Sequence, residues 1–191
     1  MKRTLLLALA FAGLMPAGLA TSAFADPPPA KIVVLDRAGI MQFSKAGQDI
    51  AKQMQTYAAQ AKADLQSRGR ALETEERGLQ QQVAILAPDL KAKRIAAFQA
   101  KQQALQADVS RKDEQMRYAL AQARQQMEAK LGPILQQLVK ERGANMVIDR
   151  QAMVFAPPAF DITTDAINRL NQQLPTVKVN FNVTPPAAPK Q

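Results

Sequence analysis

The longest polar stretch of the chain carries a narrow stripe of large apolar residues. From residue 104 to residue 131 these residues recur at alternating steps of four and seven, which places them on one face of a helix. They are Leu105, Val109, Met116, Leu120, Met127 and Leu131. A stripe this narrow cannot cover a globular core, so the pattern predicts a long helix that packs against one partner.

Helical composition extends well beyond this stretch, from a suitable N-cap at Ser44 to about Arg142. The strong break in it is Pro88, which has no backbone N–H and disfavours helical backbone at the preceding residue. We therefore expect residues 44–142 to form a long helical hairpin whose tip lies near Pro88. The first arm of this hairpin should end at Leu86.

The two arms carry different repeats. Leucine recurs every seven residues in the first arm, at Leu65, Leu72, Leu79 and Leu86. The neighbouring seam positions include polar residues such as Arg68 and Glu75, so this is half of a heptad seam. In the second arm an eleven-residue repeat that starts at Phe98 predicts a nearly straight helix. One thin seam can join two arms, and we expect the hairpin to project into solvent; a compact bundle, the alternative, would need broader apolar faces.

Glycines interrupt both arms. Gly69 and Gly78 lie inside the first arm, where each destabilises a helix by roughly 1 kcal/mol relative to Ala. They either provide flexible points or are tolerated without a role. In the second arm Gly132-Pro133 predicts a kink, and the apolar density rises after it, so we expect this arm to enter a packed body there.

The residues that flank the hairpin predict a small body and an α+β fold. In residues 26–43, a β-branched run from Lys31 to Asp36 suits a buried strand, and Asp36 can cap a brief helix that ends at Phe43. A body of roughly 75 residues buries little apolar surface alone, so we expect it to oligomerise. The candidate residues of this oligomerisation body are Ile32, Val33, Val34, Leu35, Val147, Ile148, Val154 and Phe155.

The C-terminal part of the body should lie in residues 143–174. Two short apolar runs, 145–149 and 152–155, predict two strands, and a helix capped by Asp161 or Thr163 should follow them. We expect a tail at residues 175–191, in which residues 177–183 alternate weakly as an edge strand does. The end of this tail should be disordered.

The first 25 residues have the three-part pattern of a secretory signal peptide. Lys2 and Arg3 precede an apolar run, and small residues lead to a cleavage site at Ala23-Phe24-Ala25. The mature chain should therefore begin at Asp26, outside the cytoplasm. An uncleaved N-terminal anchor is the alternative.

Composition narrows the chemistry that this chain can perform. It has no Cys, His or Trp, which excludes a His-based triad, a Cys nucleophile and an ordinary zinc site. No paired carboxylates stand out and no phosphate-binding loop is found, so we predict no catalytic, metal or cofactor site and no enzyme. Removal of Lys2 and Arg3 lowers the formal net charge from +9 to +7. Outside the cytoplasm such a chain favours acidic proteins or anionic lipid headgroups, and we expect no nucleic acid partner.

Three parts of the sequence form one combined pattern. They are KIVVLDRAGIMQFSKAGQDIAKQM, which starts at Lys31, the polar hairpin, and GANMVIDRQAMVFAPPAFDITTDAINRLNQQL, which ends at Leu174. This combination resembles the Skp (OmpH-like) family of periplasmic chaperones. Phe155 stands where many members carry Tyr. The resemblance covers about residues 30–174, and the extension 175–191 departs from it.

The resemblance implies a periplasmic homotrimer without cofactors, whose hairpins surround a cavity for unfolded outer-membrane proteins. The prediction is then an ATP-independent holdase, and the alternative is a structural coiled-coil spacer or adaptor of the cell envelope. Weak contacts from a basic surface with exposed alkyl stems can keep the strands of an unfolded barrel apart. The candidate client-binding residues are Lys62, Arg68, Arg70, Arg77, Leu79, Leu86, Lys91, Lys93, Arg94 and Ile95.

Overall fold

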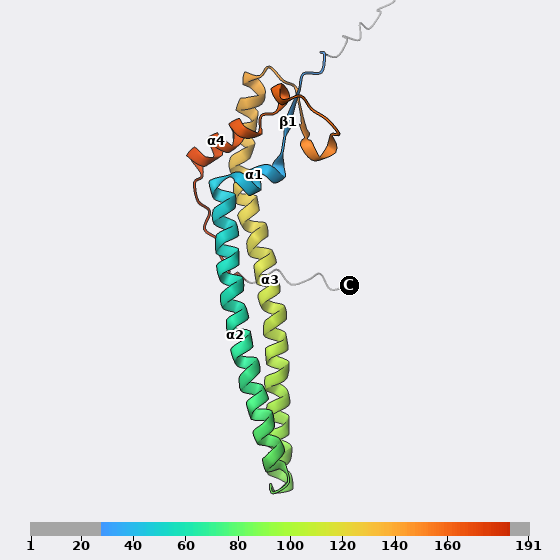
Figure 1. Ribbon diagram of the computed structural model, residues 1–191, viewed down its shortest axis with the longest axis vertical. Helices are drawn as coiled ribbons and strands as arrows, with labels where there is room; N and C mark the ends of the chain where they lie inside the picture. The colour runs from blue at the N-terminus through green and yellow to red at the C-terminus, as the bar shows by residue number, and fades with distance from the viewer. Residues whose placement is uncertain (1–27, 184–191) are drawn as a thin grey trace, which may run out of the picture.

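The computed structural model describes residues 28–183. The expected signal peptide and the end of the tail lie outside this range. Two long antiparallel helices, α2 (Lys45–Val83) and α3 (Pro88–Glu141), lie side by side and extend far beyond a small body at one end (Figure 1). The expected α+β body with a projecting helical hairpin is confirmed. No helix in the described range is both long and apolar enough to cross a membrane.

The ends of the two arms are set by local chemistry. Ser44 is fully buried, and its hydroxyl accepts a hydrogen bond from the backbone N–H of Gly47 over 3.1 Å, which caps α2. Pro88 occupies the first turn of α3, where its missing N–H leaves no bond unmade. Helix α2 ends at Val83, three residues before the expected Leu86, because a turn already precedes Pro88. At about 1.5 Å per residue, its 39 residues extend about 60 Å.

Helix α3 continues through Pro133 and enters the body beyond it. The kink expected at Gly132-Pro133 does not divide the helix, which remains one element to Glu141. Ile134 and Leu138 follow the proline and are almost completely buried. The expected entry of this arm into a packed core is therefore present.

The body contains a parallel pair of strands. β1 (Ile32–Leu35) pairs with β2 (Met146–Asp149) so that Val34 lies opposite Ile148. On its other side, Val34 forms a parallel bridge with Asp161, and its carbonyl accepts the N–H of Ile162 over 2.9 Å. β1 is thus central and buried. Parallel strands need a long crossover, and the hairpin itself supplies most of it.

The second strand expected in the C-terminal part, at residues 152–155, is absent, and this prediction was wrong. A short helix, η1 (Arg150–Ala152), follows β2 directly because the Asp149 carboxylate accepts the Gln151 N–H over 2.9 Å and turns the chain. The apolar run then continues as an irregular loop. Val154 is fully exposed and Phe155 is 77% exposed. The run is apolar, but no strand in the described residues pairs with it.

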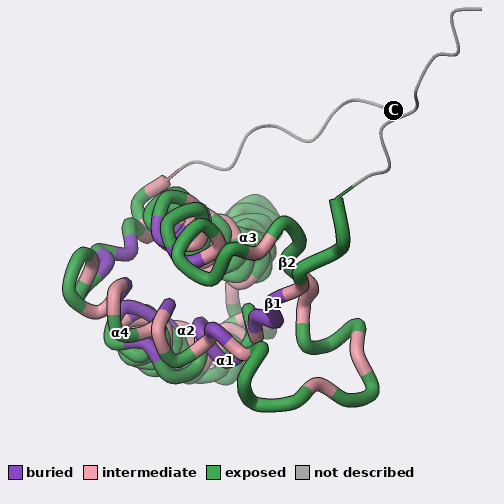
Figure 2. The backbone as a smooth tube through the Cα atoms, turned by 90° about the horizontal axis from the view of Figure 1, so that it is seen from above, coloured by how far each residue is buried: buried purple, intermediate pink, exposed green. Residues whose placement is uncertain are grey.

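The core lies where the arms meet the body. The short helix α1 (Arg37–Phe43) is capped by Asp36, which accepts the Gly39 N–H over 2.7 Å. Helix α4 (Thr163–Gln173) follows a single turn, η2 (Pro158–Phe160), and its first N–H donates to Asp161 over 2.8 Å. Figure 2 shows the buried residues gathered around β1, α1, α4 and the roots of the arms. The largest of them are Ile40, Ile50, Met127, Ile134, Leu138, Ile162 and Leu170.

The residues after α4 form an ordered segment along α2, which we call the strap and define as residues 175–183 (Figure 1). The edge strand expected at residues 177–183 is not formed. Side chains of α2, rather than a neighbouring strand, bond the strap backbone, and Val177 and Val179 are buried.

Candidate functional site

The arms contact one another along a thin line of side chains. Between residues 62 and 118 only Phe98 is buried, and the leucines of the seven-residue repeat are half-buried. Most of the outer hairpin is therefore solvated on every side except this seam. Such a surface can make contacts along its whole length but encloses no deep pocket for a small ligand.

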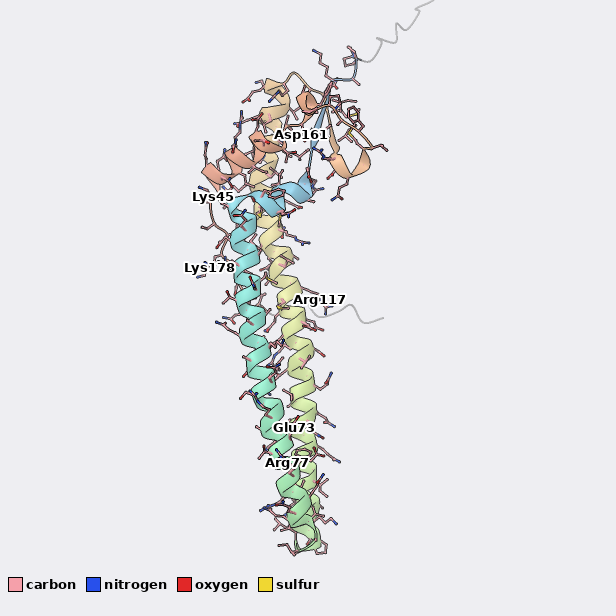
Figure 3. The ribbon with its side chains drawn as sticks, in the orientation of Figure 1. Lys45, Glu73, Arg77, Arg117, Asp161 and Lys178 are labelled. Carbon is pink, nitrogen blue, oxygen red and sulfur yellow. The ribbon has the colours of Figure 1, made fainter. Side chains whose placement is uncertain are left out.

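The expected client-binding residues divide into two groups by exposure. Lys62, Arg70, Arg77, Lys93 and Arg94 are exposed on the arms, and Figure 3 shows Arg77 on the lower part of the hairpin, near the tip. Arg68, Leu79, Leu86, Lys91 and Ile95 are half-buried. Leu79 lines a small cleft between the arms together with Gly78 and Ala97. The hairpin thus offers its positive charges to solvent more freely than its apolar side chains.

Two of the candidate arginines are also held by the opposite arm. Arg68 forms an ion pair with Asp108 over 2.5 Å, and Arg94 donates a hydrogen bond to Gln82. The hydrogen bond from Arg68 lowers the pKa of Asp108; burial opposes this shift and the charge of Arg111 adds to it. Nearer the tip, Lys101 and Glu75 form a further pair over 2.7 Å. These pairs fix the register of the arms.

The expected oligomerisation residues differ strongly in exposure. Val33, Val34 and Leu35 are buried within the protein's own core, and Ile32 and Ile148 are half-buried. In contrast, Val147, Val154 and Phe155 are exposed, and Met146 and Phe160 join them. We call the latter five residues the apolar body patch. All five belong to the body rather than to the arms.

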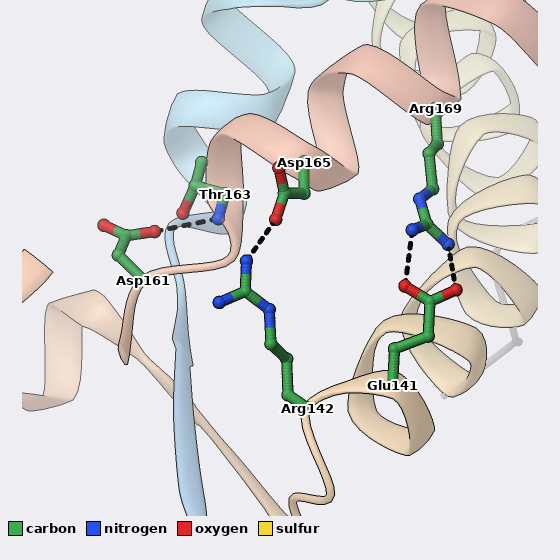
Figure 4. Close-up of polar contacts among 6 residues, drawn as sticks. All are labelled: Glu141, Arg142, Asp161, Thr163, Asp165 and Arg169. Carbon is green, nitrogen blue, oxygen red and sulfur yellow. Dashed lines mark hydrogen bonds and ion pairs between the residues drawn. The ribbon is translucent and has the colours of Figure 1, made fainter. Parts of the chain in front are cut away.

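Charged and polar contacts hold this part of the body together, and Figure 4 shows the contact between Asp161 and Thr163. Asp161 accepts the N–H of Thr163 and pairs with Arg150 over 2.6 Å. The Thr163 hydroxyl in turn accepts the Asp36 N–H over 2.8 Å. Burial raises the pKa of Asp161, but the hydrogen bonds from Thr163 and the positive charge of Arg150 outweigh it, and the pKa lies below its usual value. The loop between Arg150 and Asp161, which carries Val154, Phe155 and Phe160 of the apolar body patch, is therefore anchored at both ends.

Two further pairs join α3 to α4. Arg169 donates two hydrogen bonds to Glu141, at 2.9 and 2.6 Å, and Arg142 pairs with Asp165 over 2.6 Å (Figure 4). The bonds from Arg169 lower the pKa of Glu141 and raise that of Arg169 itself. Bidentate pairs of this kind fix orientation as well as distance.

A cleft that sequence reasoning missed lies where α1 meets the roots of the arms. Its volume is about 830 Å³, and its walls include Met41, Met54 and Met127. Arg37 and Glu128 pair over 2.9 Å beside it. The methionines come from three separate helices, so no local spacing could have grouped them. In the described residues, no three acidic side chains lie close enough to hold a metal ion.

These features define a class of protein in which a small α+β body carries a long, thinly packed helical hairpin. A family model described as "Outer membrane protein (OmpH-like)" matches residues 31–170, and the chain belongs to this family. The resemblance inferred from the sequence is thereby confirmed. The family match ends within α4, so the strap lies beyond it.

A crystal structure from Caulobacter crescentus, described as a "putative outer membrane chaperone (OmpH-like)", has a similar fold. The TM-score is 0.73 with 22% sequence identity, and the match covers 89% of this chain and 95% of that chain. At this identity the likeness establishes the fold. A search of curated proteins gave no match.

Proposed function

We propose that this protein is an ATP-independent holdase chaperone that binds unfolded outer-membrane proteins and prevents their aggregation before membrane insertion. The observation that carries the proposal is the hairpin, whose outer part buries only Phe98 between residues 62 and 118 and exposes charged side chains of both signs with a small excess of cations. Membership of the OmpH-like family and the chaperone description of the Caulobacter crescentus protein support it.

The physical basis is a large number of weak contacts. An unfolded barrel protein exposes strands with apolar and polar residues in alternation and unpaired backbone groups, which pair edge to edge unless they are kept apart. The alkyl stems of Arg70, Arg77 and Lys93 can cover apolar client side chains while their charges stay in water. No single contact needs to be strong, so clients of different sequence can bind.

We further propose that the protein acts as a homotrimer in the periplasm. The apolar body patch supports assembly, because five large apolar side chains would otherwise remain in water on a body of small size. The expected signal peptide, residues 1–25, supports export. Three hairpins joined through their bodies would surround a shared cavity that one hairpin alone cannot form.

The experiment that tests the holdase is capture in solution. The mature chain, beginning at Asp26, is mixed with a urea-unfolded outer-membrane β-barrel protein during dilution and then separated by size-exclusion chromatography. The expected result is co-elution with the unfolded client and none with the same barrel folded in detergent. Separate elution of both proteins would instead favour a spacer or adaptor.

A further inference from the structure

The strap is held by a row of three side chains on successive turns of α2. These are Asp49, Gln53 and Tyr57, which we call the α2 ladder. The Gln53 side-chain amide donates to the Val177 carbonyl over 2.8 Å and accepts the Val179 N–H over 3.0 Å. Asp49 accepts the Val177 N–H over 3.2 Å and also the Gln53 amide over 2.9 Å. Gln53 thus bonds the backbone on both sides of Lys178, as a neighbouring strand would.

The side chains of the strap alternate in their environment. Val177 and Val179 are 2% and 6% exposed, and Phe181 is half-buried. Lys178, Asn180 and Asn182 are exposed, and Figure 3 shows Lys178 beside α2. The surface of α2 therefore accepts apolar side chains at every second position of an extended segment.

The aromatic end of the ladder is fixed by the opposite arm. The Tyr57 and Phe181 rings stack with centroids 4.0 Å apart and an interplanar angle of 5°. The Tyr57 hydroxyl lies 3.3 Å from the Gln115 amide oxygen in α3, and Lys112 lies 5.8 Å from the ring centroid. Because α3 orients Tyr57, its face is available to any planar or apolar side chain at this third position.

None of the hydrogen bonds from the ladder to the strap involves a side chain of the strap. The ladder bonds backbone groups, and its apolar contacts require only alternation. The strap sequence VKVNFNV, residues 177–183, has the alternation that is typical of a transmembrane β-barrel strand. The same three side chains could therefore hold a strand of an unfolded barrel in the same way.

We propose that the α2 ladder is a binding site for an extended strand of the client, and that the strap occupies it as an internal mimic until a client strand displaces it. This inference rests on the proposed holdase function. A tethered segment competes at a local concentration of about millimolar. A short or isolated peptide would therefore displace the strap poorly, whereas an unfolded barrel presents many strands at once.

The first test uses the unaltered mature chain and amide hydrogen exchange measured by mass spectrometry. The probe is a saturating amount of a urea-unfolded outer-membrane β-barrel protein, with co-elution measured in parallel. We expect faster exchange in residues 175–183 with the client bound and unchanged exchange in α4. Co-elution with unchanged exchange in the strap would overturn this inference and leave the holdase intact. Absence of co-elution would remove both.

The second test opens the site by substitution in the strap. Val177→Asp together with Val179→Asp should release the strap and strengthen binding of a labelled peptide with the sequence of residues 176–183 about tenfold or more. Adding Gln53→Leu should remove about tenfold of the affinity, because two backbone hydrogen bonds are lost. Gln55→Leu, at an exposed position of the same helix, is the matched control. Equal loss with both glutamine variants, or no gain on opening, would contradict the proposal.

Discussion

Arg68 in the first arm lies 2.5 Å from Asp108 in the second, and this pair joins the two arms in the middle of the hairpin. Asp108 also forms an ion pair over 2.5 Å with Arg111, which lies in the same helix. A residue expected to bind clients is thus engaged within the protein. The Arg68 side chain is still 40% exposed, so both roles are compatible.

We expect Arg68→Ala to destabilise the hairpin more than the removal of a solvent-exposed arginine does. The matched variant is Arg70→Ala, because Arg70 is exposed and forms no ion pair in the described residues. Urea unfolding followed by circular dichroism should show a lower midpoint for Arg68→Ala and an unchanged one for Arg70→Ala. Equal midpoints would mean that the ion pair between Arg68 and Asp108 does not stabilise the hairpin.

The glycines of α2 should respond to alanine in opposite directions. A Cβ at Gly47 would lie 1.8 Å from the Met41 carbonyl oxygen, because α1 and α2 meet at a sharp corner, whereas Gly69 and Gly78 face open space. We expect Gly47→Ala to destabilise the fold by more than about 3 kcal/mol. Gly69→Ala and Gly78→Ala should each stabilise the helix by up to about 1 kcal/mol. Thermal unfolding of the three single variants measures this contrast.

Gly69 and Gly78 should also affect how the affinity for a client depends on the size of the client. If they are flexible points, Gly69→Ala combined with Gly78→Ala should stiffen the hairpin and weaken capture of large barrels more than of small ones. Titration of an eight-stranded and a sixteen-stranded unfolded barrel would measure the ratio of the two affinities. An unchanged ratio would remove this role from Gly69 and Gly78.

Stability should decrease in acid. The pKa of Asp161 lies below its ordinary value of 3.8, and those of Asp108 and Glu141 are also lowered by their arginine partners. A carboxyl whose pKa is lower in the folded state stabilises the fold above its unfolded pKa, and this contribution is lost as the pH falls through the folded pKa. Unfolding free energy should therefore be flat from about pH 7 to pH 5 and fall below about pH 4.

Asp161→Asn tests how much one carboxylate contributes to the dependence of the unfolding free energy on pH. It keeps an oxygen for the Thr163 N–H but loses the charge that pairs with Arg150, so it should lower stability by about 1 kcal/mol at neutral pH and flatten the acid decline. Asp113→Asn, an exposed position on α3 without an ion pair in the described residues, should do neither. Parallel acid profiles for Asp161→Asn and the unaltered protein would refute the assignment.

Much of the fold follows from local chemistry that a single sequence carries. Asp36 and Ser44 cap helices where a short polar side chain precedes a helical run, and Pro88 marks the tip. The run 152–155 has the apolar composition of a strand, and apolar residues usually pair or become buried. Val154 and Phe155 are exposed instead. An apolar run in one sequence does not show whether it is buried within its own chain or exposed on the surface.

The contacts that sequence reasoning missed join residues far apart in the chain. Gln53 and Val179 are 126 positions apart, and only the return of the chain past α4 brings them together. The partner of Arg68 depends on how the arms are rotated about their axes, which the seven-residue and eleven-residue repeats do not determine. The alternation of the strap was visible, but its partner was a helix face rather than a strand.

Assembly should depend on the apolar body patch. Val154→Asp combined with Phe155→Asp places two charges on this patch, so the oligomer should dissociate while the helix content stays unchanged, because neither side chain is buried within the protein's own core. Multi-angle light scattering gives the mass. Ile85→Asp is the control, since Ile85 is 84% exposed and lies in the turn between α2 and α3. Figure 1 shows that this turn is at the end of the hairpin far from the body. If the oligomer stays intact when Val154 and Phe155 are both replaced by Asp, the interface lies elsewhere.

The most direct test of the holdase is light scattering after dilution of a urea-unfolded outer-membrane β-barrel protein into buffer that contains the mature chain at low or high salt. Suppressed aggregation that weakens at high salt is the predicted result, because salt screens the exposed cations of the arms. Unchanged aggregation in the presence of a folded, oligomeric protein would contradict the account.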